Sequence, residues 1–583
     1  MAQNKLQKLE LTWIGKDEER EAIEPRILIE DPKYSYGDTE SGNMLIHGDN
    51  LLALKALEQE YSGKVKCIYI DPPYNTGSAF EFYDDNIEHS IWLNLMRQRL
   101  YILRNLLSKD GFICCHIDDS EGHYLKVLMD EVFGRDNYLS SLYIRVRYPD
   151  KALKQDMDFH KEMEYIHIYR KEYGAKPKRN KSIATFEKYN CYFTELSEGI
   201  DLNLGGKRVT VFKSNEWKLS LGEGSENGRK EIWATGTILD GNSSGRFFRD
   251  YLNGRYNIDG YGVLYKVYGI GDDKFDFRYF TGPQRIGATK GKYFQGVPLD
   301  QLENKKDFKY TPINSFYDLA GSFGNCRTEG GVDFRGGKKP EALIKIILEH
   351  FSEKGDLVLD SFLGSGSTAA VANKMGRKWI GVEMGNQAYS HCYVRMCRVV
   401  SGKDKTGISK DVDWKGGSGF KFYELAPSLL KEDKFGNLVI NKEYNADMLA
   451  AAMAKQEGYT YHPDNTLYWK QGQSSEYDYI YTTTQFLTIE SLDAISETMQ
   501  EGESLLICCT AFQKECTNHA PNITVKKIPQ MLLGRCEFNK DDYSLNIIDM
   551  PQLDLEEDLD DFPEDEPTAE EKSNKPVEGT LFN

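Results

Sequence analysis

Residues 65–74 read VKCIYIDPPY, a mostly apolar run that ends in a carboxylate, two prolines and a tyrosine. A short apolar run bounded by turn-forming residues is typical of a buried strand. In open α/β sheets, ligands bind just beyond the carboxyl ends of the strands. The run therefore predicts a buried strand over 65–70, with the Asp71–Tyr74 turn at a ligand-binding edge.

The sequence on both sides of this run alternates short apolar segments with amphipathic ones, and the same alternation returns after residue 340. We expect strands over 44–47, 111–117, 357–360 and 379–383, and helices over 51–61, 91–107, 124–133, 340–350 and 368–375. Strands that alternate with helices predict a parallel, doubly wound α/β sheet, built here from two separated stretches.

The stretch from 148 to 330 is different, because glycine, aromatic and basic residues dominate it and no long helical period is present. We expect an inserted domain of strands and loops there. The predicted organisation is an N-terminal arm (1–40), a first core part with the Asp71–Tyr74 turn (41–150), the inserted domain (151–330), a second core part (331–400), a C-terminal α/β domain (401–545) and an acidic disordered tail (546–583).

Composition narrows the class of protein further. The chain of 583 residues has room for roughly three domains, and it lacks the run of about 18 apolar residues that spans a membrane. Its N-terminus has no apolar signal-peptide stretch. Its 11 cysteines form no CxxC pair, so we expect no metal site, and we interpret Cys114-Cys115 as part of a buried strand in a protein of the reducing cytoplasm.

The net charge is −18, which is unexpected for a protein that binds phosphates, but the acidic excess lies mostly after residue 541. The inserted segment is mildly basic, and phosphate contact is expected there. A basic patch interleaved with Tyr173 is either a phosphate-binding surface or a solvated loop. The patch comprises Lys171, Lys176, Lys178, Arg179 and Lys181.

The Asp71–Tyr74 turn has residues suited to holding an amine. Consecutive prolines fix φ and supply carbonyls without competing N–H groups. The Asp71 carboxylate and a carbonyl of Pro72 or Pro73 can each accept a hydrogen from an exocyclic amine, which directs the nitrogen lone pair at an electrophile. The ring of Tyr74 can stack on a flipped base. The alternative is an ordinary turn at the end of a strand.

The glycine loop, residues 360–368, follows a second predicted strand and reads DSFLGSGST. Its glycines permit close approach of a ligand, and the following helix begins with free N–H groups. Glu383 follows about twenty residues later, a spacing that suits a ribose hydroxyl. The alternatives are a plain tight turn and a dinucleotide site in which Ala369 replaces the third glycine.

Two further positions leave alternatives open. Asp49, after the first predicted strand, contacts an adenine ring or its amine, caps the next helix, or does both. Lys339, just before Pro340 at the start of a helix, either meets a carboxylate or is solvated.

Together these residues resemble the amino-methyltransferases of DNA. The Asp71–Tyr74 turn looks like the catalytic D-P-P-Y of that family, and Phe362 to Gly366 looks like its F-x-G-x-G loop. The catalytic motif comes first and the basic insertion follows it, which is the permuted order of the β group. The resemblance implies a Rossmann-like, mostly parallel sheet that binds S-adenosyl-L-methionine, with the insertion as the target recognition domain.

The implied reaction is methyl transfer to N6 of a flipped-out adenine in duplex DNA, with Asp71 and Pro72 holding the amine and Tyr74 stacking on the base. Because S-P-P-Y is commoner for cytosine N4, that substrate remains an alternative. The implied cofactor contacts are Asp49, Lys339, Asp360, Phe362, Gly364, Ser365, Gly366, Thr368 and Glu383.

Within the β group, the chain resembles the modification subunit of type III restriction-modification systems. The similar segments are 11–16, 43–52, 71–77 and 416–425. The resemblance implies a bacterial homodimer with a helicase-nuclease (Res-type) partner, and a solitary methyltransferase is the alternative. One departure lies in 161–166, where the family usually has a histidine before Glu-Tyr and this chain has Met163, with His160 nearby.

The terminal residues 578–583 resemble peptides that dock on bacterial sliding clamps through a Leu-Phe pair, here Leu581 and Phe582. A disordered terminus is the alternative.

Overall fold

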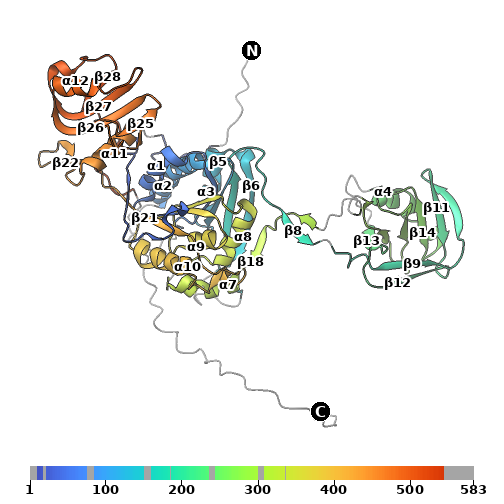
Figure 1. Cartoon of the computed structure of the whole chain (residues 1–583). Coiled ribbons are helices and arrows are strands. Elements are labelled where there is room, and N and C mark those ends of the chain that lie inside the picture. The colour runs from blue at the N-terminus through green and yellow to red at the C-terminus, as the bar shows by residue number, and fades with distance from the viewer. Residues whose placement is uncertain are drawn as a thin grey trace, which may run out of the picture. The chain divides into compact units, whose positions relative to one another are not determined.

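The computed structural model describes residues 10–543 except for 18–21, 75–84, 150–158, 184, 235–242, 300–301, 303–307 and 335–336. The predicted acidic tail and its Leu581-Phe582 end lie outside the described residues. The chain forms two compact units, Met1–Pro177 with Asn314–Asn583, and Lys178–Ile313 (Figure 1). Within the described ranges, every helix is too short or too polar to cross a lipid bilayer.

The main unit is built on an eleven-stranded sheet in the order β1-β21-β3-β20-β19-β4-β5-β7-β6-β18, with β2 paired to β21. Its strands are β1 (Leu28–Glu30), β2 (Tyr36–Gly37), β3 (Met44–His47), β4 (Val65–Ile70), β5 (Leu107–Ile117), β6 (Tyr138–Arg145), β7 (Met163–Arg170), β18 (Phe316–Asp318), β19 (Leu357–Asp360), β20 (Lys378–Glu383) and β21 (Gly419–Leu425). The strands from β21 to β5 are parallel neighbours, as the sequence predicts, whereas β7 runs antiparallel between β5 and β6.

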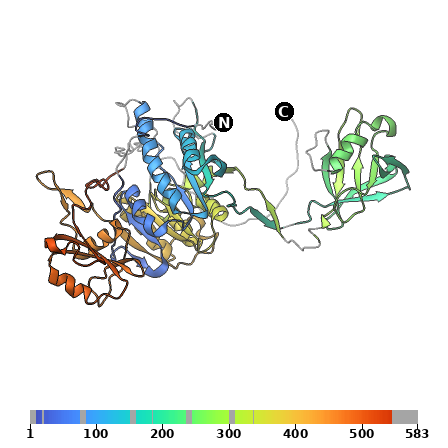
Figure 2. The ribbon, with the colours of Figure 1, turned by 90° about the horizontal axis from the view of Figure 1, so that it is seen from above.

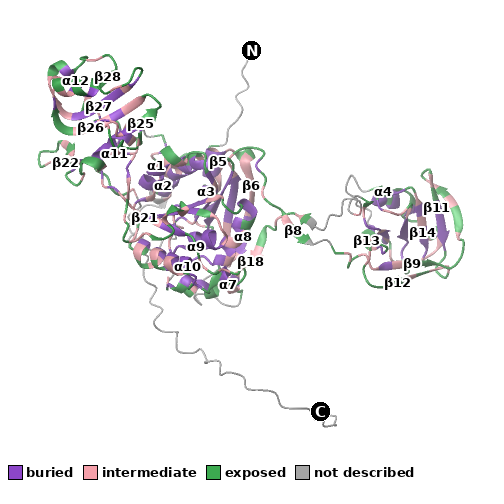
Figure 3. Cartoon of the chain, viewed as in Figure 1, coloured by how far each residue is buried: buried purple, intermediate pink, exposed green. Residues whose placement is uncertain are grey.

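Helices cover both faces of this sheet, which confirms the doubly wound prediction. The covering helices are α1 (Asn50–Tyr61), α2 (Asp85–Leu106) and α3 (Gly122–Phe133) on one face, and α8 (Glu341–Phe351), α9 (Ser367–Lys374) and α10 (Val394–Val400) on the other. Because successive side chains of a strand point to opposite faces, Cys67 and Tyr69 pack with the second set, and Ile68 and Ile70 pack with the first. Figure 2 shows this core from above, and Figure 3 shows its buried strands in purple.

The largest boundary differences concern the helix expected over 91–107, which begins at Asp85. The helix expected over 91–107 ends at Leu106, and β5 begins at Leu107 rather than at Gly111. The backbone of Leu107 pairs with Val65 of β4, so sheet pairing takes over there from the helical pattern.

The inserted unit, Lys178–Ile313, is narrower than the predicted range of 151–330. The difference arises because β7 pairs with β5 and β6, and β18 pairs with β6, so both strands belong to the main sheet. The unit contains an antiparallel six-stranded sheet in the order β10-β11-β14-β15-β16-β13 and two separate two-stranded pairs, β9–β12 and β8–β17. These strands are β8 (Asn180–Ile183), β9 (Cys191–Glu195), β10 (Ile200–Leu204), β11 (Lys207–Phe212), β12 (Trp217–Leu221), β13 (Lys230–Ala234), β14 (Leu264–Tyr268), β15 (Phe277–Thr281), β16 (Gly291–Gln295) and β17 (Phe308–Thr311).

The C-terminal part of the main unit has mixed α/β character, as expected. Its five-stranded sheet has the order β24-β25-β26-β27-β28, in which β26, β27 and β28 are parallel. The elements are α11 (Ala446–Gln456), β24 (Thr460–Tyr461), β25 (Gly472–Ser475), β26 (Asp478–Leu487), α12 (Ile489–Ser496), β27 (Ser504–Phe512) and β28 (Ile523–Lys527).

Candidate active site

Asp71, the first residue of the Asp71–Tyr74 turn, lines one pocket together with the glycine loop. Asp71 directly follows β4 and Asp360 ends β19, and these two strands are parallel neighbours. The pocket is lined by Tyr69, Asp71, Phe334, Gly337, Lys338, Lys339, Asp360, Phe362, Leu363, Gly364, Ser365, Ser367 and Thr368. The sheet topology therefore places two motifs that are distant in sequence at the edge where ligands bind in open α/β sheets.

Both oxygens of the Asp71 carboxylate have partners. The Tyr74 hydroxyl donates to Asp71 Oδ1 at 2.9 Å, and Lys339 Nζ lies 3.0 Å from Asp71 Oδ2. The buried Trp92 of α2 donates its indole N–H to the Pro73 carbonyl at 2.8 Å, which holds the turn against the helix. The prediction that Lys339 meets a carboxylate is confirmed, and the solvated alternative is wrong because Lys339 is only 7% exposed.

Two residues of this cluster, Glu164 of β7 and His116 of β5, were not predicted as site residues from the sequence. Glu164 Oε2 lies 2.8 Å from His116 Nε2, 3.1 Å from the Tyr74 hydroxyl and 3.6 Å from Lys339 Nζ. His116 is fully buried, and its Nδ1 lies 2.8 Å from the Tyr69 hydroxyl. The signal available in the sequence was a lone titratable residue, His116, at the end of an otherwise apolar strand.

The departure in 161–166 raises the question of which histidine lies beside Glu164. His160, the neighbouring histidine, directs its Nε2 to the Tyr148 carbonyl at 2.9 Å. The imidazole that contacts Glu164 comes instead from His116, on the strand paired with β7.

Electrostatics keeps this cluster charged. Burial acts to raise the pKa of Glu164, but Lys339 and His116 outweigh it and hold that pKa at about 2. Burial acts to lower the pKa of Lys339, and the Asp71 and Glu164 carboxylates outweigh it, so that pKa is raised. Burial, together with Asp71 and Glu164, raises the pKa of Tyr74 well above its ordinary value. Lys339 and Glu164 are therefore ionised at neutral pH, and Tyr74 is a hydrogen-bond donor.

The glycine loop is held open by its backbone and by Glu383. Gly364 and Gly366 have φ of +57° and +80°, a region that favours glycine. Gly364 N donates to Glu383 Oε2 at 2.7 Å, and Gly385 N donates to Oε1 at 3.1 Å. Asp360 Oδ1 accepts from Phe362 N at 2.9 Å. A Cβ placed on Gly364 would meet nothing within 4 Å, so the loop borders open space there.

Acidic groups accumulate around this space. Burial raises the pKa of Asp360 to about 7, and the nearby Asp71 and Glu383 add to the shift. Burial also raises the pKa of Glu383. Raised carboxyl pKa values mean that negative charge is unfavourable in the pocket as it stands. A cationic ligand beside these carboxylates would stabilise their ionised forms.

A family model described as DNA methylase, N6_N4_Mtase, matches residues 65–393, a range that contains both motifs. The chain belongs to this family of DNA methylases.

The methylase is similar to modification subunits of type III restriction-modification enzymes. It is 33% identical over 420 residues to the probable HindVI Mod subunit of Haemophilus influenzae, covering 67% of this chain and 54% of that one. It is 28% identical to the EcoPI Mod subunit of Escherichia phage P1, covering 63% and 61%, and 29% identical to the EcoP15I Mod subunit of Escherichia coli, covering 75% and 74%. The chain thus spans little more than half of the first of these relatives.

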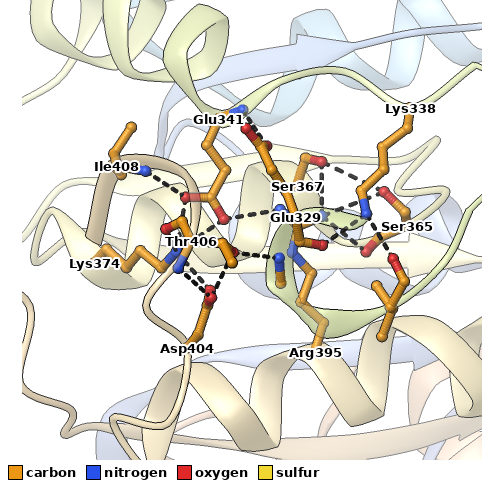
Figure 4. A network of polar contacts seen from close by, with 12 residues as sticks. Glu329, Lys338, Glu341, Ser365, Ser367, Lys374, Arg395, Asp404, Thr406 and Ile408 are labelled. Carbon is orange, nitrogen blue, oxygen red and sulfur yellow. Dashed lines mark hydrogen bonds and ion pairs between the residues drawn. The ribbon is translucent and has the colours of Figure 1, made fainter. Parts of the chain in front are cut away.

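Behind the glycine loop, the methylase has a network of buried charges (Figure 4). Arg395 Nη1 donates to the Ser367 hydroxyl at 2.8 Å and to the hydroxyl and carbonyl of Ser365 at 3.3 Å. Its Nη2 donates to Glu341 Oε1 at 2.8 Å, and Lys374 Nζ donates to Glu341 Oε2 at 2.7 Å. The network contacts the loop on the side of α8 and α10 and holds Ser365, one of the predicted cofactor contacts.

Asp49 has a different position from the other predicted cofactor contacts of the methylase. Its Oδ1 accepts from Leu51 N at 2.8 Å and Leu52 N at 3.1 Å, which confirms the helix-cap alternative. Its Oδ2 accepts from Tyr543 N at 3.0 Å. The carboxylate is buried, and the described residues that line the pocket do not include it.

The predicted basic patch is divided between the two units of the methylase. Lys171 and Lys176 belong to the main unit, and Lys178, Arg179 and Lys181 belong to the inserted unit. Lys171 Nζ donates to the Arg104 carbonyl, and burial lowers its pKa. That contact favours a structural role for Lys171, whereas the other four residues are exposed.

Proposed function

We propose that this chain methylates N6 of adenine in duplex DNA, as the modification and specificity subunit of a type III restriction-modification system in the bacterial cytoplasm. The observation that carries the proposal is the single pocket at the ends of β4 and β19 that joins the Asp-Pro-Pro-Tyr turn to the glycine loop. Membership of the DNA methylase family and similarity to type III Mod subunits support it.

The pocket suits S-adenosyl-L-methionine as the cofactor. Its acidic groups, above all Asp360 with a pKa raised to about 7 by burial, favour a ligand with a positive charge. Gly364 leaves open space beside them, and α9 begins just beyond with N–H groups available to a ligand. The residues that would hold the cofactor are Lys339, Asp360, Phe362, Gly364, Ser365, Gly366, Thr368 and Glu383. When bound, the cofactor supplies an activated methyl group on a sulfonium sulfur.

The chain's own residues orient the nucleophile. Asp71 and the Pro72 carbonyl each accept one hydrogen of the N6 amine of a flipped-out adenine, so that the lone pair stays directed at the methyl group. Asp71 also stabilises the positive charge that develops on N6, without first removing a proton. The Tyr74 ring stacks on the base, and the exposed Lys176, Lys178, Arg179 and Lys181 contact DNA phosphates.

The test of this function is Asp71→Ala. We expect the rate of methyl transfer from radiolabelled cofactor to DNA to fall by about 100-fold or more, since a preorganised acceptor at the reacting atom is lost. Cofactor affinity, measured by calorimetry, should change little because Asp71 serves the amine. Glu60→Ala, at an exposed position of α1, is the control. Methylation of adenine by Asp71→Ala at close to the wild-type rate would refute the mechanism.

The base and the partner need separate measurements. Mass spectrometry of nucleosides from treated DNA distinguishes N6-methyladenine from N4-methylcytosine, and methylation-sensitive sequencing of cells with and without the gene gives the target sequence. We expect N6-methyladenine and, by sedimentation, a homodimer. Co-purification of a large ATPase of the helicase-nuclease type supports a restriction partner, and recovery of the dimer alone from native cells favours a solitary methyltransferase.

A further inference from the structure

The catalytic carboxylate is already engaged before any base arrives. Each oxygen of Asp71 contacts one donor, the Tyr74 hydroxyl at 2.9 Å and the Lys339 ammonium at 3.0 Å. Lys339 is buried and charged, so it compensates much of the negative charge of Asp71. An incoming amine would therefore meet a weakened acceptor unless both donors move.

The same two donors have a second acceptor within reach. Glu164 Oε2 lies 3.1 Å from the Tyr74 hydroxyl and 3.6 Å from Lys339 Nζ. Both donors thus lie between two carboxylates, each slightly nearer to Asp71. Lys339 moves onto Glu164 when the 3.6 Å separation shortens and the 3.0 Å contact with Asp71 lengthens, a change that a side-chain rotamer adjustment can supply.

Glu164 itself is anchored. It belongs to β7, which pairs with β5 on one side and β6 on the other. His116, fully buried in β5, contacts the same Oε2 atom at 2.8 Å and is in turn held by Tyr69. An acceptor on a central strand with a partner behind it keeps its place while the donors move.

We propose that Glu164 is a positioning residue that receives Lys339 and the Tyr74 hydroxyl when the target amine reaches Asp71, which frees Asp71 to hold the amine. This inference rests on the proposed function.

The exchange keeps the buried Lys339 ammonium paired with a carboxylate, while the target amine takes the place of the two donors at Asp71. A buried ammonium without an anion is strongly destabilising, so Lys339 would otherwise resist displacement from Asp71. Glu164 keeps that ammonium paired throughout. Its pKa is held at about 2 against the effect of burial, by Lys339 and His116, so it remains an anion at any working pH.

The proposal makes the charge of Glu164 decisive, rather than its shape. Glu164→Gln keeps a carbonyl oxygen for Tyr74, but it cannot compete with Asp71 for an ammonium. We expect single-turnover methylation at saturating cofactor to fall on the order of 100-fold. The melting temperature and the cofactor affinity should stay close to the wild type. Glu164→Asp, which keeps the charge on a shorter side chain, should recover part of the rate.

A double-mutant cycle of Glu164→Gln and Lys339→Met gives the sharpest test, because Lys339→Met removes the cation that must move. Once Lys339 is absent, Glu164→Gln should slow the reaction little further, so the double variant should methylate at about the rate of Lys339→Met alone. If the rate of the double variant instead falls by the product of the two single losses, the proposal is wrong. So would a Glu164→Gln rate within about threefold of the wild type. If Glu164→Gln fails to fold, the same cycle with Glu164→Asp decides between these outcomes.

Two controls separate the role of Glu164 from the proposed methyltransferase function on which it rests. Glu162→Gln lies two positions away and removes a carboxylate that pairs with Arg145 instead, so it should leave the rate unchanged. The wild-type protein tests the premise, because absence of any DNA methylation by it refutes the proposed function. Normal wild-type methylation with an unaffected Glu164→Gln refutes only the role of Glu164.

Discussion

Two groups of buried charges flank the glycine loop, and they are partnered in different ways. On the pocket side, Lys339 lies between two carboxylates, 3.0 Å from Asp71 and 3.6 Å from Glu164. On the opposite side, Glu341 Oε1 accepts from both Arg395 and Lys374, Oε2 accepts from Lys374, and all three side chains are 0% exposed.

The difference separates a group that can rearrange from one that cannot. Behind the loop, Lys374 contacts two anions at hydrogen-bond distance, Glu341 at 2.7 Å and Asp404 at 2.6 Å. A shift of Lys374 toward either anion would lengthen its short contact with the other. In the pocket, Lys339 has one short contact and one longer one, so it can move from Asp71 toward Glu164 while it stays paired. The fixed group supports the loop, and the adjustable group serves the reacting atoms.

The largest expected effect comes from breaking the fixed group. Glu341→Gln removes the anion shared by Lys374 and Arg395 and should lower the free energy of unfolding by about 3–5 kcal/mol, measured by urea denaturation. The matched control on α8 is Lys345→Ala, whose pair with Asp411 is partly exposed. That control should cost less than about 1 kcal/mol. Equal stability of the two variants would show that the network does not support the loop.

A smaller effect is expected from the C-terminal segment 541–543, which reaches the first core helices. Tyr543 N donates to Asp49, Arg99 donates to the Tyr543 carbonyl at 3.3 Å, and Asp541 pairs with the buried Arg26 at 2.7 Å. A chain ended after residue 543 serves as the reference. A chain ended after residue 540 should lose about 1–3 kcal/mol in the same assay. Identical unfolding curves for the two truncations would show that residues 541–543 do not stabilise the fold.

The smallest expected effect concerns the pH dependence of cofactor binding. The pKa of Asp360 is raised to about 7 in the free protein by burial, and a bound cation would favour its ionised form. Binding then releases a proton, so affinity should rise with pH up to about 7, by at most about tenfold per pH unit, and level off above. Calorimetry across pH 5.5–8.5, a range that brackets about pH 7, measures this profile. Asp360→Asn should flatten it, and an unchanged profile in that variant would remove Asp360 as the titrating group.

Several features of the site followed from local patterns. The strand over 65–70 was predictable because a continuous apolar run before a Pro-Pro turn has few other solutions. The glycine loop was predictable because only glycine adopts positive φ at low cost. Asp49 left two alternatives, since acceptors of a helix N–H and of a ligand amine are the same kind of residue. The structure shows that its carboxylate caps α1.

The two adjacent lysines Lys338 and Lys339 have different partners, which local sequence patterns do not predict. Lys338 directs its ammonium to the carbonyls of Arg327, Glu329 and Val332, whereas Lys339 directs its own to Asp71. Both precede the same helix, and nothing in their immediate neighbours distinguishes them.

By itself, the sequence determined the parallel α/β core, the inserted domain and the two motifs of the pocket, because periodicity, turn chemistry and glycine conformation act over a few residues. The partners of Asp71 depended on tertiary structure. Glu164 reaches Tyr74 and Lys339 because β7 inserts antiparallel between β5 and β6. His116 and Lys339 then meet it from other segments. Such contacts arise from long-range strand pairing and from burial that changes the energies of charges, and neither is encoded in local sequence.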